Sequence, residues 1–255
     1  MILRRLGNKQ AIAHKIVPHF PKHNVWIEPF FGAGGMFFNK PRAKYNFLND
    51  LDGEVINCFD VLMKQKEELS EYVEMMPYCE RLWYRAKTDA PRDNVERAAW
   101  FLLLSNCGYM GKPDTMSFTV DNNKEGIIRG IENAYSELVK GENRFTNSDF
   151  RSMIAKVGLS SKAGALPLIY CDAPYLDSTN NYSAGFTEQD SRDLFDLLQS
   201  TGFNFAMSEF DHPFILQQAA ERKLNVITIG ERVNMKNRRT EILVTNYPPT
   251  APTLF

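Results

Sequence analysis

A carboxylate, a proline and an aromatic ring stand close together at the end of an apolar run. Residues 166–171 read LPLIYC, and Asp172, Ala173, Pro174 and Tyr175 follow directly. The run predicts a buried strand in a sheet covered on both faces, where polar and apolar residues need not alternate. Asp172 would then lie at the carboxyl end of the strand, the edge at which open α/β sheets bind ligands. These four residues are therefore candidates for the chemistry of the protein.

A glycine-rich loop is the second candidate. The segment EPFFGAGG, from Glu28 to Gly35, follows a short β-rich run. Its glycines Gly32, Gly34 and Gly35 allow the backbone to approach a ligand closely. The spacing differs from G-x-G-x-x-G and no Gly-Lys-Ser/Thr follows, so neither a dinucleotide nor a nucleoside triphosphate is favoured. A nucleotide-type site and a plain tight turn are both compatible with this loop.

An acid ends the next predicted strand. Residues 45–49, YNFLN, are rich in strand-forming residue types, and Asp50 follows them. An acid in this position can accept hydrogen bonds from a ribose diol. It can equally cap a helix that begins near Glu54.

The elements around these candidates predict an α/β protein. Strands are expected at 25–28, 45–49, 144–147, 166–171, 204–208, 225–229 and 241–247, with a short helix after the glycine loop and helices at 187–199 and 212–222. Between the second and third strands, apolar residues recur at helical spacing from Glu54 to Met76. Another helix is indicated from Asp93 or Asn94, and a third over residues 124–140. A mostly helical block at about 53–142 therefore interrupts the sheet.

Composition limits the classes of function. The 255 residues are 44% hydrophobic, enough for a folded core, and their formal net charge is -1, so any surface for a polyanion must be local. The four cysteines lack paired spacing and the four histidines form no ligand cluster, which argues against a disulfide framework and a metal site. No apolar run reaches the about 18 residues that suggest a membrane span. We expect a soluble, cytoplasmic protein without an export signal.

Several of these motifs, in their order along the chain, resemble those of one enzyme family. Glu28–Gly35, Asn49-Asp50, Asp149-Phe150 and Asp172–Tyr175 are similar to motifs of the Dam-like, D12-class adenine-N6 DNA methyltransferases. Gly7-Asn8-Lys9 looks like the family's Gly-Gly-Lys element, and RRTEILVTNY, residues 238–247, is similar to its closing strand. The order of the motifs is that of the family's α group.

The resemblance implies a fold and a division into domains. Residues 1–52 and 143–255 would form a methyltransferase-type, Rossmann-like α/β sheet that binds the cofactor and carries the catalytic residues. Residues 53–142 would be an inserted, mostly helical target-recognition domain that binds DNA.

The cofactor that the resemblance implies is S-adenosyl-L-methionine. Lys9 would meet its methionyl carboxylate, Asp50 its ribose hydroxyls, and Asp149 with Phe150 its adenine. The other residues implied to bind it are Glu28, Pro29, Phe30, Gly32, Gly34, Gly35 and Asp172. Besides Asp50, three of the cofactor residues have structural alternatives. Lys9 could be a solvated charge, Asp149 a helix cap and Phe150 a core residue.

The resemblance also implies how Asp172 would act. The exocyclic amine of adenine is a poor nucleophile because its lone pair is delocalised into the ring. Asp172 and the backbone carbonyl of Ala173 would accept both N–H hydrogens, which is electrostatic preorganisation for the transition state. Pro174 would fix the corner, and Tyr175 would stack on a base extruded from the duplex. Ala173 departs from the family's usual Asp-Pro-Pro-Tyr, and we expect a modest effect on rate.

Double-stranded DNA is the partner that the resemblance implies. Residues 105–118, SNCGYMGKPDTMSF, resemble the family's recognition segment only in outline and assign no recognition sequence. Phosphate contacts need basic residues, whose alternative role is that of ordinary solvated charges. The candidate DNA contacts are Arg4, Arg5, Asn106, Tyr109, Lys112, Lys236, Arg238 and Arg239. The sequence indicates no protein partner.

Three other functions are compatible with the same residues. Methylation of cytosine N4, or of adenine in RNA, uses the same amine chemistry. Family members that act on N4 commonly begin the tetrapeptide with Ser, so Asp172 favours adenine. A catalytically silent nucleic-acid-binding relative is the third, and the joint presence of Lys9, Asp172, Pro174 and Tyr175 argues against it.

Overall fold

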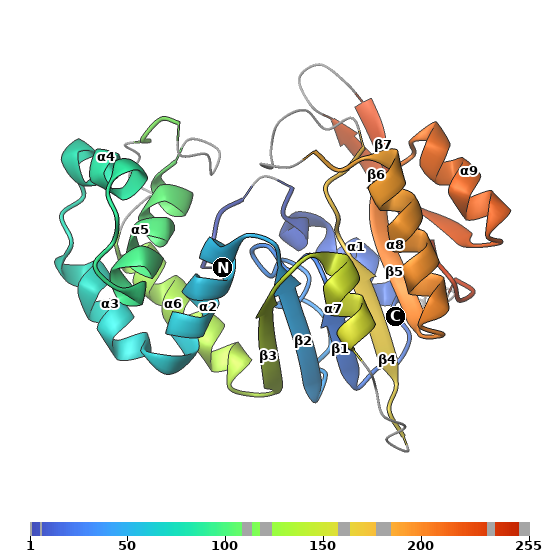
Figure 1. The fold of residues 1–255 in the computed structure, drawn as a ribbon, viewed down its shortest axis with the longest axis horizontal. Helices are drawn as coiled ribbons and strands as arrows, with labels where there is room; N and C mark the ends of the chain where they lie inside the picture. The colour runs from blue at the N-terminus through green and yellow to red at the C-terminus, as the bar shows by residue number, and fades with distance from the viewer. Residues whose placement is uncertain are drawn as a thin grey trace.

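A seven-stranded sheet forms the centre of the protein (Figure 1). The structure is a computed structural model that describes residues 2–5, 7–108, 114–117, 124–157, 164–176, 185–233 and 238–249. Its strands are β1 (Val25–Glu28), β2 (Tyr45–Asp50), β3 (Glu142–Asn147), β4 (Pro167–Cys171), β5 (Asn204–Phe210), β6 (Asn225–Val233) and β7 (Arg238–Thr245). The seven predicted strands are confirmed, with ends that differ by a few residues.

The strand order brings two functional candidates to one place. Across the sheet the order is β3-β2-β1-β4-β5-β7-β6, and only the pairs that include β7 are antiparallel. From β1 the chain proceeds outward to β2 and β3, whereas from β4 it proceeds to β5 on the other side. The carboxyl ends of β1 and β4 are therefore neighbours at the point where the strand order reverses, the usual ligand site of open α/β sheets. Glu28 ends β1, and Asp172 follows β4.

Both faces of the sheet are covered, as the apolar strands predict. Along β4, Ile169 and Cys171 face one layer, and Leu168 and Tyr170 face the other. The first layer consists of α7 (Phe150–Lys156), α8 (Glu188–Ser200) and α9 (Pro213–Glu221). The second contains the amino-terminal turns η1 (Lys9–Ile12), α1 (Ala13–Ile16) and η2 (Val17–His19), together with the helical block between β2 and β3.

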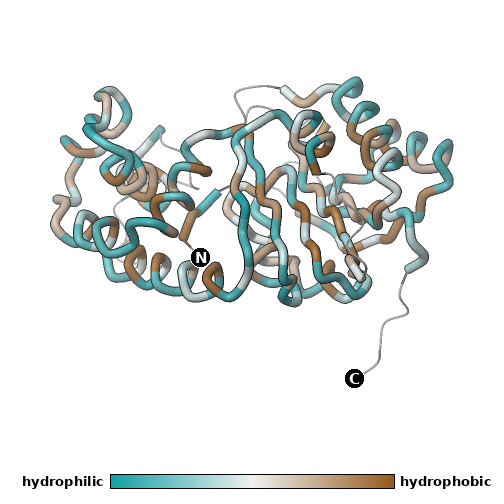
Figure 2. Tube along the Cα trace, turned by 60° about the horizontal axis from the view of Figure 1, so that its bottom comes forward, coloured by the Kyte–Doolittle hydropathy of each residue, from teal (hydrophilic) through white to brown (hydrophobic). Residues whose placement is uncertain are grey.

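The helical block shares its core with the sheet. It contains α2 (Gly53–Lys64), α3 (Lys66–Met75), α4 (Glu80–Thr88), α5 (Asn94–Cys107) and α6 (Lys124–Leu138). Hydrophobic and hydrophilic residues alternate along these helices (Figure 2), and their apolar sides continue the cluster beneath β1 and β2. The predicted start of α5 is confirmed, since Asp93 accepts a hydrogen bond from Glu96 N at 2.8 Å. Assignment of the block to target recognition stays a prediction.

Three details of the predicted elements are wrong. The long helix from Glu54 to Met76 is broken at Gln65, whose φ of -141° and ψ of 43° are not helical. After the break α3 packs on α5 and α6, whereas α2 packs on α5 and also on β2 and β3. Helix α4 was not predicted. The short helix expected after the glycine loop is instead a set of turns, with Phe38 N donating to Gly34 O at 3.0 Å.

Candidate cofactor pocket and active site

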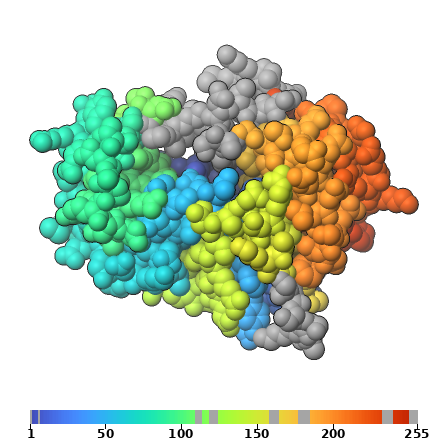
Figure 3. All heavy atoms as spheres, viewed as in Figure 1, coloured from blue at the N-terminus to red at the C-terminus, as the bar shows by residue number. Residues whose placement is uncertain are grey.

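A cavity of about 610 Å³ lies at the carboxyl edge of β1, β2 and β4. On this side of the molecule, Figure 3 shows amino-terminal residues in a recess beside the helical block. The described residues that line the cavity are Arg5, Gly7, Asn8, Lys9, residues 28–33, Gly35, Met36, residues 50–53, residues 148–151, Tyr170, Asp172, Pro174, Gly185, Phe186 and Asp190. Every residue predicted to bind the cofactor is among them except Gly34. A Cβ on Gly34 would meet the Phe38 ring at 2.7 Å, so packing explains this glycine.

Asp50 orders the glycine loop. Gly32 has a φ of 53°, a left-handed conformation that favours glycine, and its N–H donates to Asp50 Oδ2 at 2.6 Å. Asp50 Oδ1 accepts from Asp52 N at 2.9 Å. The cap of α2 is Asp52, whose Oδ1 accepts from Glu54 N at 3.0 Å, so the alternative of Asp50 as this cap is wrong. Asp50 thus holds two loops at the rim of the cavity.

Gly35 allows the amino terminus to reach the cavity. A Cβ on Gly35 would lie 1.8 Å from Asn8 Oδ1. That oxygen accepts a hydrogen bond from Gln10 N at 3.0 Å and so caps η1, the turn that begins with Lys9. The glycine loop and the Gly7-Asn8-Lys9 element are therefore packed together, and Lys9 points into the site.

Lys9 contacts the predicted catalytic acid. Its Nζ lies 2.7 Å from Asp172 Oδ1 and 3.1 Å from the carbonyl oxygen of Gly7. The Lys9 side chain is 3% exposed, which excludes the alternative of a solvated charge. Ala173 is buried, and Pro174 lines the cavity. The acid thus lies at the cavity wall with a buried cation beside it.

Tyr175 is held on three sides. Its hydroxyl donates a hydrogen bond to Glu241 of β7, and its ring packs edge-on against Phe210 with centroids 4.7 Å apart. Lys9 Nζ lies 4.5 Å from the centre of the Tyr175 ring and 3.7 Å from Glu241 Oε1. Burial raises the pKa of Tyr175 well above its ordinary value, so its hydroxyl stays protonated and can donate. Glu241 therefore connects the predicted catalytic tetrapeptide to the closing strand.

Aromatic rings form the end of the cavity beside α7. Phe30 and Phe150 have centroids 5.4 Å apart, and Phe186 lies 6.1 Å and 6.0 Å from them. Asp149 caps α7, since its Oδ1 accepts from Arg151 N at 2.8 Å. Asp149 is thus a helix cap and also a cavity residue, so the two interpretations of the sequence are compatible.

The cavity wall is rich in acids. Six acidic residues line it, Glu28, Asp50, Asp52, Asp149, Asp172 and Asp190, against the three cations Arg5, Lys9 and Arg151. Burial raises the pKa of Glu28 to about 8, so five of these acids are counted as carboxylates at neutral pH. Such a wall repels a nucleoside polyphosphate and attracts a ligand that carries positive charge. Among the residues that the structure describes, no group of three His, Cys, Asp or Glu side chains could hold a metal ion.

One known protein family matches most of the chain. Residues 6–240 match the family described as D12 class N6 adenine-specific DNA methyltransferase. The chain belongs to this family. The family membership confirms the resemblance found in the sequence and shows that the protein is a DNA methyltransferase of the adenine-specific class.

Individual relatives of this methyltransferase are distant but span most of its length. The type II methyltransferase M1.LlaDCHI of Lactococcus lactis subsp. cremoris is 25% identical over 94% of this chain and 93% of its own. A DNA adenine methylase of Vibrio cholerae is 26% identical over 94% of both chains. Among solved structures, the rRNA methyltransferase AviRa of Streptomyces viridochromogenes matches 92% of this chain and 82% of its own with a TM-score of 0.42 and 12% identity.

The described residues among the methyltransferase's predicted DNA contacts have different environments. Asn106 is buried and donates to the carbonyl oxygens of Ile2 and Leu102, so a DNA contact there is not favoured. Arg5 lines the cavity and pairs with Asp52 at 2.6 Å. Arg4 is exposed, and the Arg239 guanidinium lies 5.3 Å from the centre of the Phe210 ring. The predictions for Tyr109, Lys112, Lys236 and the Arg238 side chain lie outside the described residues.

Asn49, to which the sequence assigned no role, connects the ends of three strands. Asn49 Nδ2 donates to the carbonyl oxygens of Pro29 and Ser148 at 2.9 Å and 2.8 Å. Its Oδ1 accepts from Thr146 Oγ1 at 2.8 Å. A side-chain amide that is depleted in strands, placed directly before Asp50, was the available indication of this role. Glu241, Phe186 and Arg151 were also missed, because each acts across a large sequence separation.

Glu28 should make stability depend on pH. Burial raises its pKa to about 8, although Trp26 Nε1 donates to Glu28 Oε2 at 2.8 Å, which opposes the shift. Between about pH 4.5 and 8 the folded protein therefore holds a proton that the unfolded chain has released, so the free energy of unfolding falls as the pH rises through this window. Glu28→Gln keeps an acceptor for Trp26 and should stabilise the protein at pH 8 by a few kcal/mol, on the order of the 1.4 kcal/mol per pKa unit of linkage.

Chemical denaturation across a pH series measures this effect. Glu209, whose pKa burial also raises to about 8, should leave part of the slope in the variant. Glu67→Gln, at an exposed position, is the matched control and should leave the pH profile unchanged. An unchanged slope in Glu28→Gln would mean that Glu28 is ionised in the folded protein at neutral pH.

Proposed function

We propose that this methyltransferase transfers a methyl group from S-adenosyl-L-methionine to the N6 amine of an adenine that is extruded from duplex DNA. The observation that carries the proposal is the position of Asp172. It stands at the strand-order reversal, on the wall of the cavity, opposite the glycine loop and beside a buried lysine. Family membership supports the substrate class and the type of reaction.

The cavity suits the proposed cofactor. S-adenosyl-L-methionine carries a sulfonium and an ammonium against a single carboxylate, and with Glu28 protonated the wall carries five carboxylates against three cations. Turns rather than a regular helix follow the glycine loop, so the helix amino terminus that typically cradles a phosphate is not formed there. The three phenylalanine rings suit the flat, apolar faces of an adenine. When bound, the cofactor supplies the electrophilic methyl group.

The residues around the cavity have proposed roles in binding. Phe30, Phe150 and Asp149 would hold the adenosine part, Asp50 the ribose, and Lys9 the methionyl carboxylate. Lys9 already contacts Asp172, so we propose that it bridges the cofactor end and the catalytic end of the site.

The proposed chemical role belongs to the tetrapeptide after β4. An ionised carboxylate only accepts hydrogen bonds, so Asp172 would accept one amine hydrogen and the carbonyl of Ala173 the other. Both acceptors favour the pyramidal amine, whose lone pair is available for the methyl group. Tyr175, fixed by Glu241 and Phe210, would stack on the extruded base. The amine becomes acidic only after methylation, so no general base is required.

The direct test is incubation of the protein with duplex DNA and cofactor that carries a labelled methyl group. We expect label in N6-methyladenine, at positions that sequencing then maps. Label in cytosine N4 or only in RNA would replace the proposed substrate with one of the alternatives. Cofactor binding without transfer to any nucleic acid would indicate a catalytically silent relative.

Neutralising Lys236, Arg238 and Arg239 together should weaken DNA binding about equally on all sequences. The net charge of the chain is only -1, so attraction to phosphates must come from a local basic surface, and residues 236–239 include three basic residues within four positions. Phosphate contacts set affinity and salt dependence, whereas base contacts set the site. Each lost phosphate contact should reduce the salt slope by about 0.9.

Binding across a salt series on cognate and non-cognate duplexes measures this prediction. Substitutions in residues 105–118 are the comparison, because they should change which sites are methylated. If the 236–239 variant changes the preferred site and keeps the salt slope, the two surfaces have been assigned the wrong way round.

A further inference from the structure

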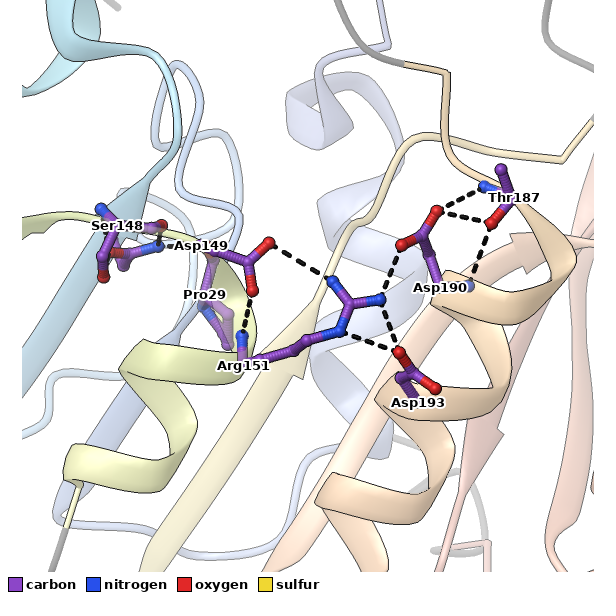
Figure 4. A network of polar contacts seen from close by, with 8 residues as sticks. Pro29, Ser148, Asp149, Arg151, Thr187, Asp190 and Asp193 are labelled. Atoms are coloured by element: carbon purple, nitrogen blue, oxygen red, sulfur yellow. Dashed lines mark hydrogen bonds and ion pairs between the residues drawn. The ribbon is translucent and has the colours of Figure 1, made fainter.

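Arg151 joins two helices at the aromatic end of the cavity (Figure 4). From the first turn of α7, its Nη2 lies 2.6 Å from Asp190 Oδ1 and 2.6 Å from Asp193 Oδ2, both on α8. Its Nε also donates to Asp193 Oδ2 at 2.8 Å, and its Nη1 lies 3.3 Å from Asp149 Oδ2. One guanidinium thus connects the cap of α7 to the first turns of α8.

The contacts continue from Asp190 to the segment before α8. Asp190 Oδ2 accepts hydrogen bonds from Thr187 N at 2.8 Å and from Thr187 Oγ1 at 2.6 Å. Thr187 N–H belongs to the peptide bond that links it to Phe186. A continuous series of polar contacts therefore runs from Arg151 through Asp190 to the backbone beside Phe186.

Phe186 and Arg151 also meet at the aromatic rings of the cavity. The guanidinium carbon of Arg151 lies 4.3 Å from the centre of the Phe150 ring, and Phe186 packs against Phe150 and Phe30. All four of these side chains line the cavity, together with Asp190. The polar contacts through Asp190 and the ring contacts with Phe30 and Phe150 thus hold the adjacent residues Phe186 and Thr187.

We propose that Arg151 is a positioning residue that latches α8 to α7 and so holds Phe186 against the adenosine end of the cofactor site. The latch determines how tightly S-adenosyl-L-methionine is bound and has a much smaller effect on the methyl-transfer step. This inference rests on the proposed function of the cavity. It adds Arg151 as a positioning residue and Phe186 as a contact for the adenosine part of the cofactor.

The chemistry of the latch requires an arginine. Three carboxylates face the guanidinium, and its planar fork of donors reaches all of them, which the single ammonium of a lysine would not. Without that cation the three acids repel one another, and α8 loses this polar connection to α7. The hydrogen bond from Arg151 also holds the pKa of Asp193 below its usual value, as expected for an intact pair.

The test compares the dissociation constant of labelled S-adenosyl-L-methionine in wild type and Arg151→Gln. We expect the constant to rise about tenfold, the size of a typical coupling within a polar network. The KM for the cofactor should rise much more than kcat falls. Asp193→Asn, a milder change that weakens the same latch, should act in the same direction, and thermal melting reports whether each variant is folded.

A second arm asks whether the effect passes through Phe186. Phe186→Ala alone should weaken cofactor binding, and Arg151→Gln should add little in that background. The control is Asp196→Asn, which removes an ion pair of α8 with Arg222, 2.6 Å long and away from the cavity, and should leave binding unchanged. A full Arg151→Gln effect in the Phe186→Ala background, or an unchanged dissociation constant in a folded Arg151→Gln variant, would overturn the latch. Failure of the wild type to bind the cofactor would instead overturn the proposed function.

Discussion

Asp172→Ala should lower methyl transfer to duplex DNA by about 10²–10³-fold, the usual cost of removing one preorganised group that stabilises a transition state. The expectation follows from the place of Asp172 at the cavity wall and from its contact with Lys9, 2.7 Å away. Cofactor binding should fall less than turnover, because the glycine loop and the aromatic end of the cavity are unaffected. Single-turnover rates and the cofactor dissociation constant, measured on the same preparations, separate the two effects.

Loss of Asp172 also affects a buried cation. Breaking a buried ion pair costs about 3–5 kcal/mol. The loss here should be smaller, because the Asp172 side chain is 21% exposed and Glu241 stays 3.7 Å from Lys9 Nζ. Asp172→Asn keeps an acceptor oxygen of the same shape and is the matched variant, and thermal melting shows whether either protein is folded. Near-normal turnover in a folded Asp172→Ala protein would show that the proposed mechanism is wrong.

Tyr175→Ala should lose most of the activity, whereas Tyr175→Phe should keep much of it. Stacking of a base on an aromatic ring is worth about 1–3 kcal/mol, which corresponds to roughly 5–150-fold in rate if it is lost in the transition state. Phenylalanine retains the ring and its edge contact with Phe210. The hydroxyl donates to Glu241, so Tyr175→Phe should still lower stability by about 1–3 kcal/mol, the cost of leaving a buried acceptor without its donor.

Glu241→Gln separates the charge of the Glu241 carboxylate from its hydrogen bond with the Tyr175 hydroxyl. The amide oxygen can still accept the hydrogen bond from Tyr175, but the charge beside Lys9 is removed. Steady-state rates on duplex DNA should follow the order wild type, Tyr175→Phe, Tyr175→Ala. Equal losses in both tyrosine variants, reproduced by Glu241→Gln, would assign the effect to the hydroxyl and its carboxylate.

The sequence by itself predicted the strands correctly, because these depend on local patterns. Apolar runs of four to eight residues, each ended by a polar or turn residue, indicated β1, β2 and β4 and placed Glu28, Asp50 and Asp172 at their ends. That these acids would share a cofactor site was implied by the family resemblance, and all three line the cavity. The family membership likewise followed from short motifs in a fixed order.

Local patterns failed where the conformation depends on packing. Continuous helical periodicity runs through Gln65, yet the helix breaks there, since α2 packs on both α5 and the sheet whereas α3 packs on α5 and α6. Asn106 was predicted to contact DNA from its place in a recognition-like segment. Its amide instead binds the amino-terminal backbone at Ile2, a partner 104 residues away that the segment itself does not reveal.

Only the tertiary structure decided which charges meet. Lys9 and Asp172 are each recognisable in the sequence, but their contact exists because Gly35 lets the amino-terminal turn pack on the glycine loop. Glu241 reaches Tyr175 because β7 returns antiparallel beside β5, and Arg151 reaches Asp190 because α7 and α8 cover the same face of the sheet. Sequence periodicity fixes which face of an element is apolar. The pairing of buried charges depends on long-range packing, since a desolvated charge is stabilised by whichever partner the fold brings within hydrogen-bond distance.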